Sequence, residues 1–288
     1  MLSIYIDGFP VEMTASLLPQ KTKLKLGTLL HVHLQNKISK NKKPEQPHPL
    51  FDQKKMERLL LHLRDIIRKL NRKTGKTDWN NYYDETISGH AYLEEKEKLI
   101  HDMLAQTDIH TALDIGSNKG FFARLLAEKK INVIATDKDD SCINQLYKDI
   151  RDKGQSNILP LVIDIANPSP GIGLDNMERS SFLNRVHADL VLALAIVHHL
   201  VITQNIPFTK LAAGFSALTI KYLIIEYIPP EDEKAKLLIQ RNNNYHAYTE
   251  QEFENCFGEY FIPIKKEVIP KSSRIIYLFE KKASHANT

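Results

Sequence analysis

The stretch LDIGSNKG, from Leu113 to Gly120, decides the fold of this chain of 288 residues. It starts as an apolar strand and turns through Gly116 and Gly120 into a segment with helical spacing. Glycine at these positions lets the backbone turn tightly and approach a ligand without a Cβ in the way. Asn118 stands where a dinucleotide fingerprint has its middle glycine, so the spacing DxGxxxG weakens a pyrophosphate-binding interpretation. We expect a nucleotide-like ligand at this carboxyl edge of a strand.

Short apolar strands alternate with amphipathic helices around this stretch. Strands are predicted at 111–115, 132–136, 158–163, 189–195 and 222–226, and helices at 94–105, 120–129, 141–153 and 208–218. This alternation predicts a parallel sheet covered on both faces, the doubly wound α/β arrangement. A helix starting at the capping box of Thr249 and Glu252 leads to strands at 261–268 and 274–280, which we expect to form a closing antiparallel hairpin.

Charge divides the chain into two parts. Between Gln20 and Lys76 there are sixteen Lys or Arg and four Asp or Glu, a local net charge of +12, whereas the whole chain carries only +4. Apolar residues from Met56 to Leu70 follow helical spacing opposite a basic face. We therefore predict a mainly helical basic extension at 1–76, an aromatic lid and helix segment at 77–108, and the ligand-binding domain at 109–288.

Several classes of protein are disfavoured by the sequence. Cys142 and Cys256 cannot build a disulfide framework and lie in no zinc pattern, which favours a reducing compartment. No positive region precedes an apolar run at the start, and no apolar run approaches the ~20 residues that span a bilayer. We expect a cytoplasmic protein without a membrane partner. His31 and His33 form an HxH pair on a possible strand, and with no third ligand nearby we expect no metal site.

Three predicted strands end in an aspartate, which is a stronger signal than the glycines alone. Asp114 precedes the first glycine and suits a ligand with an ammonium group. Asp137 follows 23 residues later, where an acid can accept both hydroxyls of a ribose. Asp164 ends the third strand, where a side chain could meet the exocyclic amine of adenine.

The motif formed by Asp114, Gly116, Asn118 and Gly120 matches a DxGxNxG pattern, and through it the chain from about Ile109 to Lys281 resembles class I S-adenosylmethionine-dependent methyltransferases. The resemblance implies a Rossmann-like fold with a seven-stranded, mostly parallel sheet whose last strand is antiparallel. It implies S-adenosylmethionine as the cofactor. It places the methionine end against the first glycine loop, the ribose on the second strand, the adenine after the third and the sulfonium at the end of the fourth. The implied cofactor residues are Asp114, Gly116, Ser117, Asn118, Gly120, Asp137, Lys138, Asp164, Ile165, Ala193 and Leu194.

A narrower resemblance rests on several phrases of the sequence. The segments 159–164, 167–170, 188–194, 198–200 and 225–232 are similar to a subgroup of bacterial methyltransferases that includes nodulation proteins of the NoeA type. Larger members of that subgroup carry more N-terminal sequence, which leaves open whether a lobe for substrate recognition lies outside this chain.

Residues after the fourth and fifth strands are candidates for catalysis. Methyl transfer needs the acceptor in line with the methyl group and deprotonated where necessary, so a general base is optional. His198 and His199 are expected near the methyl position, where one could take a proton at neutral pH. Glu226, expected at the same rim, could orient the acceptor or a histidine. The alternatives are a histidine that packs under the sheet and a glutamate that bonds to a neighbouring loop.

Four further residues are candidates for a lid or for substrate contact. Trp79, Tyr82 and Tyr83 precede the helix at 94–105, and we predict that one of them closes the site, although aromatics there also serve as packing residues. The long connection from Asn167 to Val186 contains Arg179, which could reach a polar acceptor, or could lie in a solvated loop.

Three functions compete. The leading hypothesis is an enzyme that transfers a methyl group to an oxygen or nitrogen of a small-molecule acceptor. The second is an RNA or DNA methyltransferase guided by the basic segment, which lacks interleaved aromatics. The third is a binding protein that keeps the cofactor fold without turnover. Neither the acceptor nor the oligomeric state follows from the sequence.

Overall fold

The computed structural model of the chain describes residues 8–40, 52–70, 89–105, 107–241 and 248–283. It divides into two compact units, one of residues 1–74 with 172–175 and one of residues 75–171 with 176–288. Of the described helices, none is long and apolar enough to cross a membrane.

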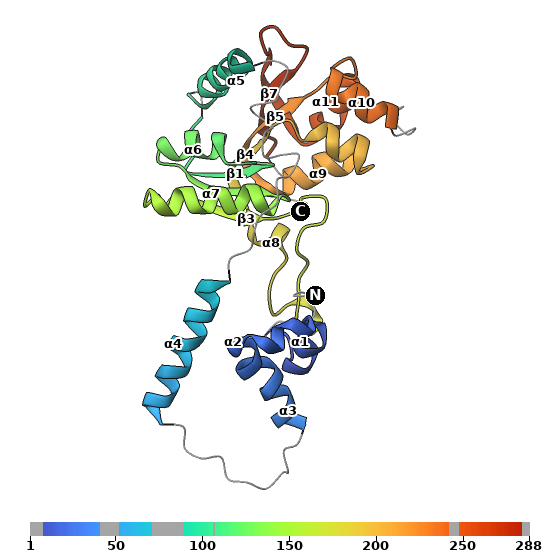
Figure 1. Cartoon of the computed structure of the whole chain (residues 1–288). Helices are drawn as coiled ribbons and strands as arrows, with labels where there is room; N and C mark the ends of the chain where they lie inside the picture. The colour runs from blue at the N-terminus through green and yellow to red at the C-terminus, as the bar shows by residue number, and fades with distance from the viewer. Residues whose placement is uncertain (1–7, 41–51, 71–88, 106, 242–247, 284–288) are drawn as a thin grey trace. The chain divides into compact units, whose positions relative to one another are not determined.

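The larger unit is built on a seven-stranded sheet (Figure 1). Its strand order is β3-β2-β1-β4-β5-β7-β6, in which β7 is antiparallel to both of its neighbours and the other pairs are parallel. The strands are β1 (Thr111–Ile115), β2 (Asn132–Asp137), β3 (Ile158–Val162), β4 (Ala188–Ala193), β5 (Thr219–Tyr227), β6 (Phe261–Val268) and β7 (Ile275–Lys281). The order changes direction at β1, so the ends of β1 and β4 flank the position where α/β sheets place ligands.

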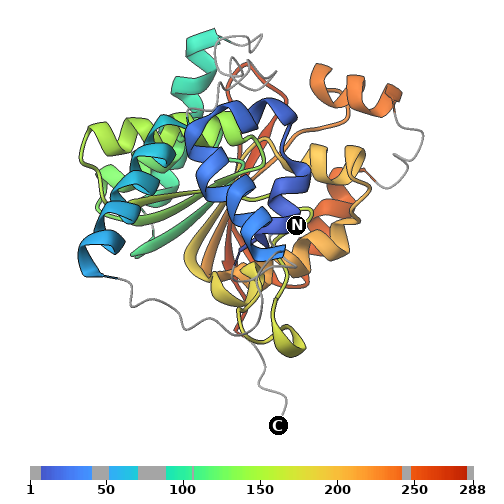
Figure 2. The same ribbon diagram turned by 60° about the horizontal axis from the view of Figure 1, so that its bottom comes forward.

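Helices cover both faces of this sheet, as the two layers on either side of the strands in Figure 2 show. One buried cluster joins α5, α6 and α7 to one face, and a second joins α9 and α11 to the other. All six residues of β4 are buried, as expected for a central parallel strand. The helices are α5 (Gly89–Leu104), α6 (Phe121–Glu128), α7 (Asp140–Asp152), α8 (Phe182–Arg185), α9 (Phe208–Leu218), α10 (Glu233–Arg241) and α11 (Glu250–Gly258). Two short turns, η3 (Leu174–Asn176) and η4 (His199–Thr203), lie in the connections on either side of β4.

The predicted doubly wound fold is confirmed, including the antiparallel last strand and the hairpin of β6 and β7. Side-chain caps define helix starts: Asp139 accepts from the backbone N–H of Ser141 and Cys142, and Thr249 accepts from that of Glu252. Two helices, α8 and α10, were not predicted, because four and nine residues give too little periodicity to stand out from the connections around them.

The smaller unit is helical over its described residues. Its elements are α1 (Val11–Leu17), η1 (Gln20–Leu24), α2 (Leu26–Thr28), η2 (Leu29–Leu34), α3 (Gln35–Lys40) and α4 (Gln53–Lys69). The strand expected around His31 and His33 was wrong, because both lie in the π-helical turn η2. Leucines 26, 29, 30 and 34 follow helical spacing, and this longer pattern overrides a three-residue alternation. His33 bonds to the side chain of Thr22 at 2.9 Å, and His31 to His62 at 2.9 Å.

Candidate functional site

A pocket opens at the carboxyl ends of β1, β2, β3 and β4, beside helix α5. The pocket has an empty volume of ≈ 930 Å³, which includes the open space at its mouth. In a parallel sheet these ends meet at one edge, and the loops that follow them form the ligand site. Nine of the eleven residues that the resemblance implied line it, namely Asp114, Gly116, Ser117, Asn118, Asp137, Lys138, Asp164, Ile165 and Leu194.

The loop between β1 and α6 is held in a tight, left-handed course. Gly116, Asn118 and Gly120 have φ angles of 76°, 51° and 75°, a region that glycine enters freely and asparagine tolerates. The N–H groups of residues 116 and 117 both donate to the carbonyl of Thr136, at 2.8 and 2.9 Å, which fixes the loop against the end of β2. A Cβ on Gly120 would lie 2.6 Å from Leu146 Cδ1, so the start of α6 packs directly on α7. Gly120 therefore shapes the loop without lining the pocket.

Asp114 is a buried carboxylate at the end of β1 that faces the pocket. Its side chain is 2% exposed, and its Oδ2 atom makes no hydrogen bond within the described part of the chain. Burial, together with the negative charge of Asp137, raises the pKa of Asp114 to about 7, although the ammonium of Lys96 acts in the opposite direction. An unpaired oxygen on a buried carboxylate is costly, so a ligand that brings a cation to Oδ2 relieves that cost.

Unlike Oδ2 of Asp114, both carboxylate oxygens of Asp137 accept backbone hydrogen bonds. Its Oδ2 accepts the backbone N–H of Asn118 at 2.9 Å, and its Oδ1 accepts that of Asp139 at 2.8 Å. Burial raises its pKa, while these two N–H groups act to lower it. The carboxylate thus keeps a fixed position at the end of β2, with lone pairs left for hydroxyl groups of a ligand.

The outer wall follows β3 and β4. Asp164 lies exposed at the mouth and accepts the N–H of Ala166 at 3.0 Å, and Ile165 provides an apolar surface beside it. Leu194 lines the pocket beyond β4, whereas Ala193 is fully buried within the strand and does not.

The two histidines have different surroundings. His199 lines the pocket and is half-buried; burial, followed by the positive charges of Lys138 and Lys234, lowers its pKa to about 4. His198 is fully buried, does not line the pocket, and has no hydrogen-bond partner among the described residues for either ring nitrogen. Their ring centroids lie 4.1 Å apart. Of the pair, only His199 is placed to meet a ligand.

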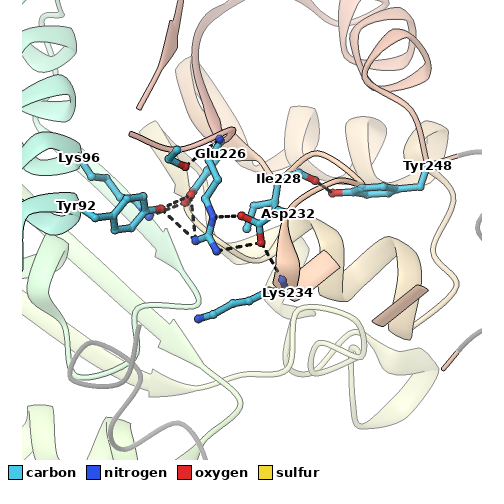
Figure 3. A network of polar contacts seen from close by, with 9 residues as sticks. Tyr92, Lys96, Glu226, Ile228, Asp232, Lys234 and Tyr248 are labelled. Atoms are coloured by element: carbon cyan, nitrogen blue, oxygen red, sulfur yellow. Dashed lines mark hydrogen bonds and ion pairs between the residues drawn. The ribbon is translucent and has the colours of Figure 1, made fainter. Parts of the chain in front are cut away.

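Glu226 does not lie on the pocket rim, where its position at a strand end predicted it. It is fully buried and accepts hydrogen bonds from Tyr92 Oη at 2.7 Å and Lys96 Nζ at 2.5 Å (Figure 3). Arg274 Nη1 lies 3.8 Å from the same carboxylate, and its guanidinium also pairs with Asp232, at 2.8 Å. Burial acts to raise the pKa of Glu226, but the two cations outweigh it and keep that pKa below the ordinary value.

Lys96 is the charged lining residue that sequence reasoning missed. It is 4% exposed, on the inner face of α5. Tyr92, Lys96, Ile100 and Met103 recur at spacings of four, four and three, so a lysine within an apolar helical stripe was the available signal. The other lining residues outside the predicted set are Ile115, Phe122, Ile163, Ala195, Ile196, Leu200 and Gln204.

Of the four residues predicted to form a lid or to contact the substrate at this pocket, the structure describes only Arg179. Arg179 is exposed in the connection between β3 and β4 and does not line it. Trp79, Tyr82 and Tyr83 lie outside the described residues.

The sheet order, the antiparallel β7 and the glycine loop after β1 define this chain as having the class I methyltransferase fold. N-methyltransferase NodS from Bradyrhizobium japonicum WM9, in complex with S-adenosyl-L-homocysteine, aligns with a TM-score of 0.50 at 14% identity, over 76% of this chain and 98% of that one. The PH0226 protein of Pyrococcus horikoshii OT3 aligns with a TM-score of 0.53 at 13% identity, over 72% of this chain and 100% of that one. Likenesses at these identities establish the fold.

Sequence similarity names one relative. The chain is 28% identical to Nodulation protein NoeA of Rhizobium meliloti (strain 1021) over 286 residues, which is 96% of this chain and 60% of that protein. The chain thus spans about 60% of the length of the curated relative it matches. No family model matches the chain. The resemblance predicted from the sequence is confirmed in both parts, the fold and the similarity to NoeA.

Proposed function

We propose that this chain is an S-adenosylmethionine-dependent methyltransferase that methylates an oxygen or nitrogen of a small-molecule acceptor. The observation that carries the proposal is the buried Oδ2 of Asp114 at the wall of the pocket, which has no hydrogen-bond partner among the described residues, since a cationic ligand there would stabilise the ionised form of this carboxyl group. The solved structure of NodS with S-adenosyl-L-homocysteine supports the same cofactor class for this fold.

The residues of the pocket fit the cofactor in several places. Asp114 would take the ammonium of the methionine part. Gly116 lines the pocket with a φ angle of 76°, and without a Cβ its backbone can lie close to the ligand. Asp137, held by two backbone N–H groups, would accept the ribose hydroxyls. Ile165 offers an apolar surface for the adenine.

When bound, S-adenosylmethionine supplies an electrophilic methyl group on a positively charged sulfur. The protein then has to hold the acceptor in line and accept any proton it loses. His199 is the imidazole on the pocket wall that would take this proton: its lowered pKa keeps the ring neutral at pH 7, and the same shift makes it a weaker base than a free histidine. The apolar wall formed by Leu194, Ile196 and Leu200 limits water around the reacting atoms.

Calorimetry and turnover test the proposal. We expect purified protein to bind S-adenosylmethionine and S-adenosylhomocysteine, and Asp137→Ala to abolish or strongly weaken both. Incubation with S-adenosylmethionine and a pool of candidate small acceptors should release S-adenosylhomocysteine. Absence of binding to the native protein would refute the cofactor, whereas binding without product from any pool would favour a non-catalytic binding protein.

A nucleic acid is the second candidate acceptor, favoured by the basic segment. Helix α4 carries six exposed Lys or Arg residues, which are Lys54, Lys55, Arg58, Arg64, Arg68 and Lys69. Phosphate binding by such a surface depends steeply on salt, because each contact releases counterions. If the affinity for RNA or DNA stays flat between low and physiological salt, this candidate is removed.

A further inference from the structure

Four charged side chains and a tyrosine form a largely buried network that reaches the pocket at Lys96 (Figure 3). Glu226 and Asp232 supply two negative charges, and Lys96 and Arg274 supply two positive charges, so the network is balanced within itself. Tyr92 completes it by donating to Glu226 and accepting from Arg274 Nη1 at 3.1 Å. The network joins α5, β5, the start of α10 and the start of β7.

Two carboxylates act on Lys96. On one side its ammonium is 2.5 Å from Glu226 Oε2. On the other side it shares the pocket wall with Asp114, and the two charges influence each other. Yet no ion pair within 4.0 Å joins these two described residues, and Oδ2 of Asp114 has no bonding partner in the described part of the chain. The lysine therefore pairs with the carboxylate behind the wall and leaves the one inside the pocket without a cation.

We propose that Glu226 is a positioning residue that holds Lys96 away from Asp114, which keeps the pocket carboxylate open for the ammonium group of the cofactor. This inference rests on the proposed function and deepens it. It also gives Glu226 a role other than the contact with acceptor or histidine that the sequence suggested.

The chemistry of the side chains explains why Lys96 needs a residue that holds it away from Asp114. A lysine ammonium on its four-carbon stem can turn toward any nearby carboxylate, and a buried carboxylate without a partner attracts the nearest cation. An ion pair between Lys96 and Asp114 would occupy the ligand's place and would have to be broken before binding. Glu226 prevents this because Tyr92 and Arg274 fix its carboxylate on the far side of the lysine.

The test uses two ligands that differ in one part. S-adenosylhomocysteine carries the amino-acid group with its ammonium and carboxylate, and 5′-methylthioadenosine has the same adenine, ribose and thioether but lacks that whole group. Glu226→Gln keeps the shape of the side chain and removes its charge, so Lys96 is released toward Asp114. We expect the affinity for S-adenosylhomocysteine to fall by about tenfold or more, because a buried ion pair must be broken first, and the affinity for 5′-methylthioadenosine to stay unchanged.

The charge-neutral double variant Glu226→Gln/Lys96→Met provides the rescue. It removes the released lysine as well, so the affinity for S-adenosylhomocysteine should return to within about threefold of the native value. The proposal would be overturned if Glu226→Gln lowered the affinity for both ligands equally or left both affinities unchanged. If the single variant does not fold, selective loss of S-adenosylhomocysteine by the double variant would still overturn the proposal, because it would mean that Lys96 itself contacts the ligand. Native protein that binds neither ligand would instead refute the proposed function.

Discussion

Replacing Gly120 by alanine should destabilise the larger unit through two separate effects at one atom. The residue has a φ angle of 75°, where a side chain with a Cβ costs about 1–2 kcal/mol. The new Cβ would also lie 2.6 Å from Cδ1 of the fully buried Leu146, and overpacking of a tight core costs about 1–3 kcal/mol. Together these give about 2–5 kcal/mol, which corresponds to a fall of roughly 4–20 °C in the thermal midpoint for a unit of this size.

Two other glycines separate the effects. Gly154 has a φ angle of 65°, and a Cβ added there would meet open space, so Gly154→Ala should show the conformational cost alone. Gly214 lies in α9 with a regular φ and open space, so Gly214→Ala should raise the midpoint slightly, because alanine is the better helix former.

The thermal midpoint, followed by circular dichroism for the native protein and the three variants, is the assay. We expect the order Gly214→Ala, native, Gly154→Ala, Gly120→Ala from most to least stable. If the thermal midpoint of Gly120→Ala is no lower than that of Gly154→Ala, Gly120 does not pack on Leu146 as described, and this contact does not fix the conformation of the loop.

Three further predictions concern the polar groups. Arg274→Met should lower stability by about 3 kcal/mol in chemical denaturation because it removes a buried guanidinium that pairs with the half-buried Asp232 and lies 3.8 Å from the fully buried Glu226, whereas Arg151→Met, which breaks an exposed pair, should leave stability unchanged. Asp137→Asn should weaken S-adenosylhomocysteine and 5′-methylthioadenosine alike in calorimetry, by about tenfold or more, since both ligands carry the ribose. His199 should titrate near pH 4 by NMR; because the unfolded chain binds this proton at about pH 6.5, stability should fall as the pH drops from about 6.5 to about 4, and His199→Asn should flatten that fall.

The sheet and the glycine loop could be predicted from the sequence because both depend on local patterns. Apolar strands of five to nine residues, and the residues that follow their carboxyl ends, are read directly along the chain. Parallel strands bring those ends together, so the strand pattern alone was enough to place Asp114, Asp137 and Asp164 at one pocket.

The buried network could not be predicted in the same way. Glu226 bonds to side chains 130 and 134 positions earlier in the chain, and no local pattern reports such a distance. Its position at a strand end suggested the rim, but its side chain is fully buried and bonds to Tyr92 and Lys96 of α5. Similarly, His198 and His199 are neighbours in sequence, and only the turn η4 decides which of the two reaches the pocket.

A crystal structure of the chain with S-adenosylhomocysteine tests the central claim most directly. We predict the amino nitrogen of the ligand within about 2.7–3.2 Å of Asp114 Oδ2, with the ribose on Asp137 and Lys96 still bonded to Glu226. A ligand whose amino nitrogen lies away from Asp114, or a complex in which Lys96 has moved onto Asp114, would contradict it.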